Sequence, residues 1–403
     1  MISKIILFLY VGLSFISAEQ QIVGHATIID SLSNLKKKSP ERAIRYARLL
    51  LAEEELQNSD FEPRIYNLLG EIYLDIGLPS LALTNFIEYG LRTKSKKSPW
   101  NKINIGNVYF MEEKWIIAKE KYLEALDYFR KFNQSKPNTI SGKAVALSNL
   151  GRIEMHLENY DDALVYFKEA LNVKRGSARY KMFFQSKSGP NISYGSEANG
   201  VAYQHWLLAT LYAKWNIYDM ALEQLQVSDS ILYYVNSDNV PKTTRFSSKI
   251  YLGKNHSLRT QILFELNNYD GAYQESKLAI GLLKESPIKL ARHYKIESDI
   301  FIGQNELYGA LEAIDEGLKI CELNGLSALE IDLLNHKLEI LKANKLDKSA
   351  LDISKTIIDK KTILSNNRMH MLLESLNYKA ELAVNRKKLD NAKERELILF
   401  IIV

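Results

Sequence analysis

Apolar residues recur along most of this chain at the three- and four-residue spacing of one helix face. The clearest stretch runs from Asn149 to Ala170. Its pattern predicts one helix that ends near Leu157, a short polar turn, and a second helix. Two consecutive amphipathic helices with a short turn between them indicate an antiparallel helix pair.

Two residues of this stretch have almost no side chain, Gly151 and Ala163. We expect them on facing surfaces, because the distance between packed helices depends on the side chains at the contact. We expect Tyr160, Phe167 and Ala170 to pack around that contact.

The same order of small, apolar and aromatic positions recurs along the chain. The recurrences are Leu69, Gly70, Tyr73, Ala82, Phe86 and Tyr89; Ile105, Gly106, Tyr109, Ala118, Tyr122 and Ala125; Leu208, Ala209, Tyr212, Tyr218, Ala221 and Leu225; Tyr269, Ala272 and Ala279; Phe301 and Ala310; and Leu338, Leu341 and Ala350. This order resembles the tetratricopeptide repeat (TPR), a helix–turn–helix unit of about 34 residues. The resemblance covers roughly residues 63–359. It implies an all-α, right-handed α-solenoid of antiparallel helix pairs that binds other proteins.

The flanks of the array are less regular. Residues 19–62 are expected to form N-terminal capping helices, because Ser39-Pro40-Glu41 starts a helix and end repeats are usually atypical. The spacing of the repeats predicts an insertion at 172–200 and a smaller one at 236–253. Neither Gly nor Pro occurs from Leu326 onward. This favours a long polar helix over about 360–396, without a strict heptad.

Residues 1–18 have the order of a secretory signal peptide. Lys4 gives the charged start, an apolar run follows, and Ile16-Ser17-Ala18 offers a small-residue cleavage site before Glu19. An uncleaved anchor is the alternative, but the apolar run is short for about 30 Å of hydrocarbon. We therefore expect export, to the periplasm or the extracytoplasmic face of a membrane.

The chain ends on an apolar run, Leu397 to Val403. This run is too short to span a bilayer, which needs about 20 residues. It resembles the start of a cut transmembrane helix, in the order found in bacterial membrane-bound TPR sensors. The alternative is a sticky helix end that folds back on the last repeat. We expect membrane contact, if any, through this segment.

Composition adds few constraints. A formal charge of +5 is mild for 403 residues and does not favour nucleic acid. The single cysteine, Cys321, has the helical context of a buried apolar side chain. No phosphate loop, His-Glu-x-x-His pair or cysteine cluster occurs. His336 and Glu339 share a helix face, which is more often solvated than metal-binding. We expect no enzyme activity, no cofactor and no metal.

The resemblance to TPR proteins implies a partner-binding concave surface lined by the first helix of each pair. The positions that it assigns to this surface are Asn67, Glu71, Trp100, Asn107, Arg152, Tyr203, Trp206, Thr210, Gln261 and Lys295. Trp100, Tyr203 and Trp206 are candidate anchors, since aromatic residues are enriched at interface hot spots. The alternative is that these rings only fill gaps between neighbouring repeats.

The predicted insertion is a second candidate surface. It lacks Asp and Glu over 172–196 and interleaves basic with aromatic residues: Lys174, Arg175, Arg179, Tyr180, Phe183, Phe184 and Lys187. Such a segment can bind nucleic acid, but export argues against that. An acidic partner or an anionic lipid surface remains possible, as does a loop whose aromatics pack on the solenoid.

Together these patterns predict a protein–protein interaction scaffold. The leading interpretation is the exported sensory part of a truncated bacterial membrane signalling protein. The alternative is a free-standing exported scaffold or chaperone in envelope assembly. The DNA that follows the codon for Val403 would distinguish the two.

Overall fold

The computed structural model describes residues 28–33, 35–36, 39–53, 59–93, 98–132, 136–184, 194–235 and 241–402. At residues 184, 389–390 and 393–402 it describes the backbone alone. The predicted signal peptide, Lys187 and Val403 lie outside the described residues.

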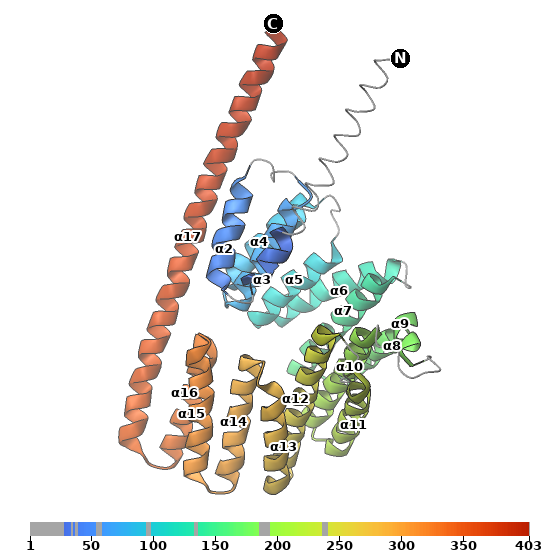
Figure 1. Cartoon of the computed structure of the whole chain (residues 1–403), viewed down its shortest axis with the longest axis vertical. Helices are drawn as coiled ribbons and strands as arrows, with labels where there is room; N and C mark the ends of the chain where they lie inside the picture. The colour runs from blue at the N-terminus through green and yellow to red at the C-terminus, as the bar shows by residue number, and fades with distance from the viewer. Residues whose placement is uncertain are drawn as a thin grey trace. The chain divides into compact units, whose positions relative to one another are not determined.

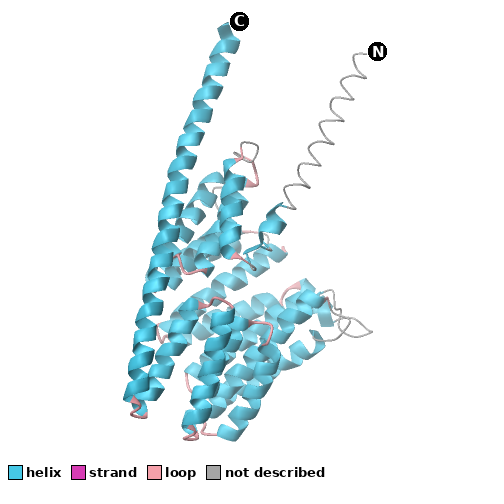
Figure 2. Cartoon of the chain, turned by 60° about the vertical axis from the view of Figure 1, so that its left-hand side comes forward, coloured by secondary structure: helices cyan, strands magenta, loops and turns pink. Residues whose placement is uncertain are grey.

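The described chain is built from helices and contains no strand (Figures 1 and 2). The helices are α2 (Pro40–Ala52), α3 (Glu62–Asp75), α4 (Pro79–Arg92), α5 (Pro99–Met111), α6 (Trp115–Lys131), α7 (Pro137–His156), α8 (Tyr160–Arg175), α9 (Ala178–Phe184), α10 (Gly195–Lys214), α11 (Tyr218–Val235), α12 (Lys242–Glu265), α13 (Tyr269–Leu283), α14 (Pro287–Gly303), α15 (Leu307–Leu323), α16 (Ser327–Ala343) and α17 (Asp347–Ile402). This confirms the all-α prediction of paired helices with a long C-terminal helix.

The chain divides into two compact units. Unit 1 comprises residues 1–124 and 368–403, and unit 2 comprises residues 125–367. Within unit 2, the pairs α7/α8, α10/α11, α12/α13 and α14/α15 make the most extensive contacts. The first helices of neighbouring pairs also contact one another, from α7 through α10, α12 and α14 to α16. They therefore form one continuous surface of unit 2, which we call the inner face.

Small residues on the first helices admit large rings from the second helices. A Cβ built on Gly151 would lie 2.6 Å from the ring of Phe167. Gly70 meets Phe86, and Gly106 meets Tyr122 at 2.5 Å, in the same way. Gly151 is thus at the helix contact, as the sequence predicts, although the side chain that it faces is Phe167. Ala163 is fully buried in the same core.

The turns inside the pairs share one backbone conformation. A residue in the left-handed region closes the first helix: Gly77, Glu113, Glu158, Asn216, Asn267, Asn305 or Lys345. Gly325 has the same conformation in the turn between α15 and α16. In the α7–α8 turn, the N–H of Asn159 then donates to the carbonyl of Glu154 at 2.9 Å. Such bonds satisfy carbonyls that the helix end leaves open.

The second half of α17 belongs to unit 1. Met371, Leu372 and Tyr378 pack against its apolar core. The Tyr378 hydroxyl donates to the backbone carbonyl of Arg48 at 2.7 Å, and Arg386 forms an ion pair with Glu62. A cavity of about 320 Å³ lies among α2, α3, α4 and this part of α17.

Two segments expected as insertions are largely helical. Residues 172–175 complete α8, and α9 follows within the predicted 172–200 insertion. Most of the expected 236–253 insertion is the start of α12, a helix of 24 residues. The expected 360–396 helix is part of α17, which begins at Asp347 and runs unbroken for 56 residues. No helix in the described part of the chain is long and apolar enough to span a membrane.

Candidate functional site

Three aromatic rings gather on the inner face of unit 2. Tyr203 and Trp206 of α10 are stacked, with ring centroids 5.7 Å apart. Tyr251 of α12 lies 5.7 Å from Tyr203. Residues at i and i+3 share a helix face, so α10 presents both of its rings towards α12. All three side chains are partly buried.

Lys254 of α12 lies over these rings. Its Nζ is 3.3 Å from the ring centroid of Trp206, 4.7 Å from that of Tyr203 and 5.7 Å from that of Tyr251. An ammonium group over an aromatic face is attracted by the ring quadrupole. We call Tyr203, Trp206, Tyr251 and Lys254 the lysine–aromatic cluster.

The charges nearest to Lys254 are also positive. Burial, together with the charges of Lys289 on α14 and Arg152 on α7, lowers the pKa of Lys254 to about 7. Arg152 also lies close enough to act on Tyr203, although burial dominates there and raises the pKa of that phenol. Four consecutive first helices therefore contribute to one basic, aromatic surface.

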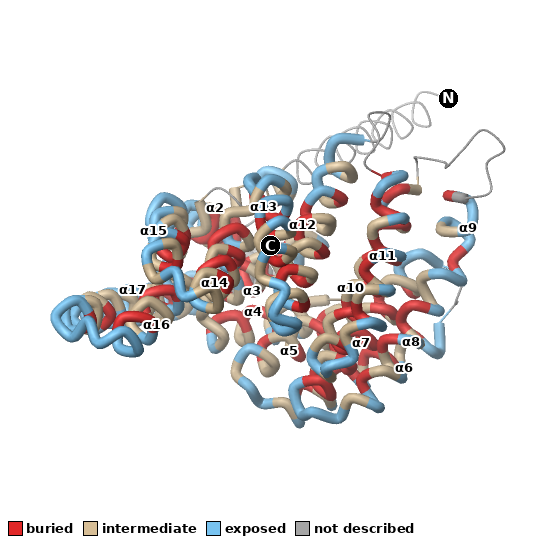
Figure 3. Tube along the Cα trace, turned by 90° about the horizontal axis from the view of Figure 1, so that it is seen from below, coloured by how far each residue is buried: buried red, intermediate tan, exposed pale blue. Residues whose placement is uncertain are grey.

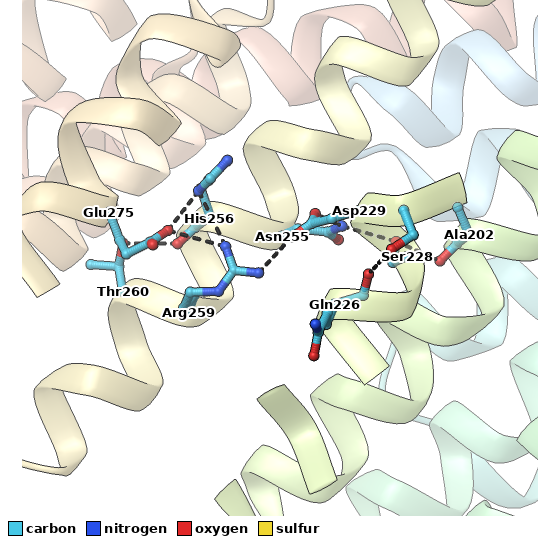
Figure 4. Close-up of polar contacts among 10 residues, drawn as sticks. Ala202, Gln226, Ser228, Asp229, Asn255, His256, Arg259, Thr260 and Glu275 are labelled. Carbon is cyan, nitrogen blue, oxygen red and sulfur yellow. Dashed lines mark hydrogen bonds and ion pairs between the residues drawn. The ribbon is translucent and has the colours of Figure 1, made fainter. Parts of the chain in front are cut away.

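A buried polar network fixes the rotation of α12 behind the cluster. Asn255, the neighbour of Lys254, is fully buried. Its Nδ2 donates to Ser228 Oγ at 2.9 Å and to Asp229 Oδ1 at 2.7 Å, both on α11 (Figure 4). Ser228 Oγ donates to the carbonyl of Ala202 on α10 at 3.1 Å. Asn255 is held on the core side, so Lys254, about 100° further round the helix, lies on the inner face.

Arg259 extends this network to the next helix. Its guanidinium pairs with Asp229 at 2.6 Å and with Glu275 of α13 at 3.2 Å. His256 contacts the same Glu275 carboxylate at 2.6 Å. Buried polar groups need such partners, and this arginine has two carboxylates. Lys254, five residues earlier on the same helix, has no carboxylate partner among the described residues.

A second polar cluster lies deeper, between α12, α13 and α14. His293 is fully buried, and its ring nitrogens contact Ser257 Oγ and Ser276 Oγ, each at 2.9 Å. Ser276 Oγ also donates to Glu297 at 3.1 Å. Burial lowers the pKa of His293 to about 4 and raises that of Glu297. These hydrogen bonds link side chains of α12, α13 and α14 inside unit 2.

The other predicted inner-face residues of unit 2 occupy less distinctive environments. The Thr210 hydroxyl donates to the carbonyl of Trp206 at 2.8 Å. Gln261 is exposed. Lys295 pairs with Asp332 at 3.4 Å. Of the predicted positions, Arg152, Tyr203 and Trp206 are therefore those that the structure brings together.

In unit 1 three of the predicted positions, Asn67, Glu71 and Asn107, form hydrogen bonds within the unit. Glu71 accepts from Lys36 at 2.9 Å and from Asn67 at 2.8 Å. Asn107 accepts from the Tyr122 hydroxyl at 2.8 Å, below Gly106. Trp100 is partly buried in the first turn of α5.

The basic residues of the predicted insertion are partly neutralised by Glu197, just beyond the acid-free segment. Lys174 and Arg179 each lie 3.8 Å from this carboxylate, and Lys174 also donates to Ser141 Oγ at 3.2 Å. Phe183 is fully buried, so its ring packs inside the chain. Arg175 and Tyr180 line an open hollow of about 440 Å³ with His205 and Ile231. Only the backbone of Phe184 is described.

Sequence reasoning missed Tyr251, Lys254 and Lys289. The sequence pattern places Tyr251 in an expected insertion at 236–253. The first-helix positions of this pair were therefore assigned only to residues after 253, although α12 begins at Lys242. The available signal was the spacing of Tyr251, Lys254 and Ser257, which continues the face of the first helix backwards by two turns. Buried, intermediate and exposed segments follow one another along these helices (Figure 3).

Within the described residues, no group of three His, Cys, Asp or Glu side chains is placed to hold a metal ion. Cys321 is buried, and burial raises its pKa to about 11. A thiol with so high a pKa is a poor nucleophile at neutral pH.

The fold is that of TPR-type helical repeat proteins. No family model matches the chain, and no curated protein matches its sequence. Solved structures match in fold. RapI in its apo form is 12% identical, with a TM-score of 0.50, over 76% of this chain and 99% of that one.

Two further structures give the same result. A Rap protein complexed with competence and sporulation factor is 14% identical, with a TM-score of 0.51, over 85% of this chain and 99% of that one. Aspartyl phosphate phosphatase F from Bacillus subtilis is 14% identical, with a TM-score of 0.50, over 82% of this chain and 75% of that one. Likeness at such low identity shows the fold alone.

Proposed function

We propose that this chain is a protein-interaction scaffold whose inner face in unit 2 binds a peptide segment of a partner. The observation that carries the proposal is the group of three partly buried rings, Tyr203, Trp206 and Tyr251, on adjacent first helices. Partly exposed Trp and Tyr side chains supply large contact area with few rotatable bonds. Hot spots of protein interfaces are enriched in these residues.

The fold supports this proposal. Stacked helix pairs create an extended surface on one side of the array, and repeat proteins use such surfaces for binding. One protein of similar fold, the Rap protein named above, was solved in complex with competence and sporulation factor. That complex supports the proposal that a protein of this fold can bind a partner.

The test is selection from a display library of short random peptides. Wild-type protein should enrich a set of peptides, and Trp206→Ala should weaken their binding by about 30-fold, since a hot-spot side chain contributes about 2 kcal/mol. Tyr203→Ala provides a second variant at the same surface. Tyr308→Ala is the control, because Tyr308 on α15 is 82% exposed and outside the cluster.

Thermal unfolding of each variant accompanies the binding measurement. A loss of binding counts only where the melting temperature stays near that of the wild type. If wild type enriches no peptide, or if Trp206→Ala and Tyr203→Ala bind the enriched peptides as wild type does, the proposal fails.

We further propose that the protein is exported and acts as a sensory module. The sequence order of residues 1–18 supports export. N-terminal sequencing of protein from the source cells should find Glu19 or a near neighbour as the first residue. Retention of Met1 on the cellular protein would contradict export and leave the scaffold proposal standing.

A further inference from the structure

The lysine–aromatic cluster contains a cation without a counter-charge. Four other partly buried basic side chains of unit 2 have carboxylate partners: Lys174 has Glu197, Arg259 has Asp229 and Glu275, Lys337 has Asp315, and Lys360 has Glu330. Lys254 has aromatic rings around it and no carboxylate or hydrogen-bond acceptor among the described residues.

The surroundings increase this imbalance. Arg152 and Lys289 add positive potential from α7 and α14. Lys289 itself lies near Arg292, and burial with this neighbour lowers its pKa. Removing a charged group from water without an opposite charge is costly, and the neighbouring cations add repulsion. An anion placed at Lys254 would offset both effects.

The same cluster holds a second polar group without a partner. The indole Nε1 of Trp206 is buried, and no acceptor for it exists among the described residues. Native proteins leave few buried donors unpaired. The two unsatisfied donors are an ammonium and an indole N–H, which both require an acceptor. A ligand that satisfies both groups must therefore supply a hydrogen-bond acceptor. The positive charge of the ammonium favours an anionic acceptor.

The rings do not form a site for a cationic ligand. Aromatic groups of this kind can enclose a quaternary ammonium or a methylated lysine. Here Lys254 already occupies the faces of Trp206 and Tyr203. A second cation would meet Lys254, Arg152 and Lys289 at close range.

We infer that Lys254 recognises the carboxylate of an Asp or Glu side chain in the peptide segment that binds the inner face. This inference rests on the proposed function, since it names the chemistry of the ligand at the same surface. The apolar part of the segment packs beside Lys254, against the parts of the three rings that remain exposed. Lys254 reads its acidic residue, with Arg152 and Lys289 contributing positive potential.

The experiment uses two display libraries of short random peptides that are identical except for one fixed central residue, Glu in one and Gln in the other. Wild-type protein should bind the pooled Glu library about tenfold more tightly than the Gln library, which corresponds to about 1.4 kcal/mol. Lys254→Met should bind both libraries equally. This variant keeps the length of the side chain, and a melting temperature at or above that of wild type shows that it folds.

Lys295→Met is the matched control. Lys295 lies on α14 and already has Asp332 as its partner, so its replacement should leave the preference for Glu unchanged. Lys254→Arg keeps the charge and should retain a preference for Glu over Gln.

The outcomes separate the two proposals. Equal binding of both libraries by wild type overturns the carboxylate inference and leaves the peptide-binding function intact. A preference for Glu that survives in Lys254→Met overturns the assignment to Lys254. Failure of wild type to enrich either library overturns the proposed function, and the carboxylate inference with it.

Discussion

Unit 1 and unit 2 are built from the same kind of helix pair, and both hold paired charges, but unit 2 also holds one lysine without a carboxylate partner among the described residues. In unit 1, Glu71 is paired with Lys36, and Lys102 is paired with Glu124. In unit 2, Lys254 is set among rings near two other cations. Charges that are paired within the chain stabilise its own fold. The unpaired charge of Lys254 is the feature on which the proposed carboxylate recognition rests.

The largest expected effect tests the packing that the two units share, a glycine on the first helix against a ring from the second. Gly106→Leu in unit 1 and Gly151→Leu in unit 2 should each lower the free energy of unfolding by about 3 kcal/mol, because a large side chain would overlap the facing ring. A Cβ at these positions already falls 2.5 Å from Tyr122 and 2.6 Å from Phe167. Hydrogen exchange of each unit, rather than one global melting curve, reports the loss.

The control for this pair is Gly281→Leu. A Cβ at Gly281 on α13 meets nothing within 4 Å, so this variant should keep or slightly raise stability. If Gly106→Leu and Gly151→Leu differ greatly from each other, the two units do not share one packing rule.

The next largest effect is a loss of stability at acid pH that we expect in unit 2, where His293 lies. The pKa of His293 falls from 6.5 to about 4 on folding. The unfolded state therefore binds more protons between these values, and unit 2 loses stability as the pH falls through this window. The loss from His293 is at most about 3 kcal/mol. Glu297, whose pKa is raised by burial, takes up a proton in the folded state and reduces the net loss.

His293→Gln is the variant that isolates this contribution. Its unit 2 should show a flatter decline in hydrogen-exchange protection between pH 6.5 and pH 4 than wild type does. An unchanged slope would show that His293 does not control the acid response of unit 2.

The smallest effect contrasts two lysines. Lys254→Met should raise the free energy of unfolding by about 1 kcal/mol, because it removes a partly buried charge that has no carboxylate partner among the described residues. Lys36→Met in unit 1 should lower it by up to about 1 kcal/mol, because it leaves Glu71 and Asp75 without their partner. Urea unfolding of both variants measures the two changes. Equal signs would remove the distinction between the units.

The sequence predicted the repeat packing well, because that packing depends on local spacing. Gly70, Gly106 and Gly151 stand at a constant distance from Phe86, Tyr122 and Phe167, and this order identifies the pairs without further information. In α10 and α12 the position of these glycines is taken by Ala209 and Thr260. The repeat pattern is therefore weaker in these two long helices. Residues 242–253, the first half of α12, were therefore expected as part of an insertion.

The candidate site was only half predictable. Tyr203, Trp206 and Arg152 occupy positions that the repeat pattern assigns to the first helices. Lys254 does not differ in the sequence from the many other lysines. Its distinction is the absence of a carboxylate partner among the described residues, and pairing depends on tertiary contacts. Glu197 shows the converse, since it neutralises two basic residues that looked unopposed in the sequence.

The long helix α17 also bears on the order in which the molecule is assembled. Tyr378 bonds to Arg48 across 330 residues, and Arg386 to Glu62 across 324. Repeat arrays usually fold through neighbouring contacts, and bringing distant segments together adds loop-closure entropy. On a growing polypeptide, the helices of unit 2 have been synthesised before residues 368–386 exist. Unit 1 begins first and is completed last, so its early helices wait with an uncovered apolar surface until the second half of α17 arrives.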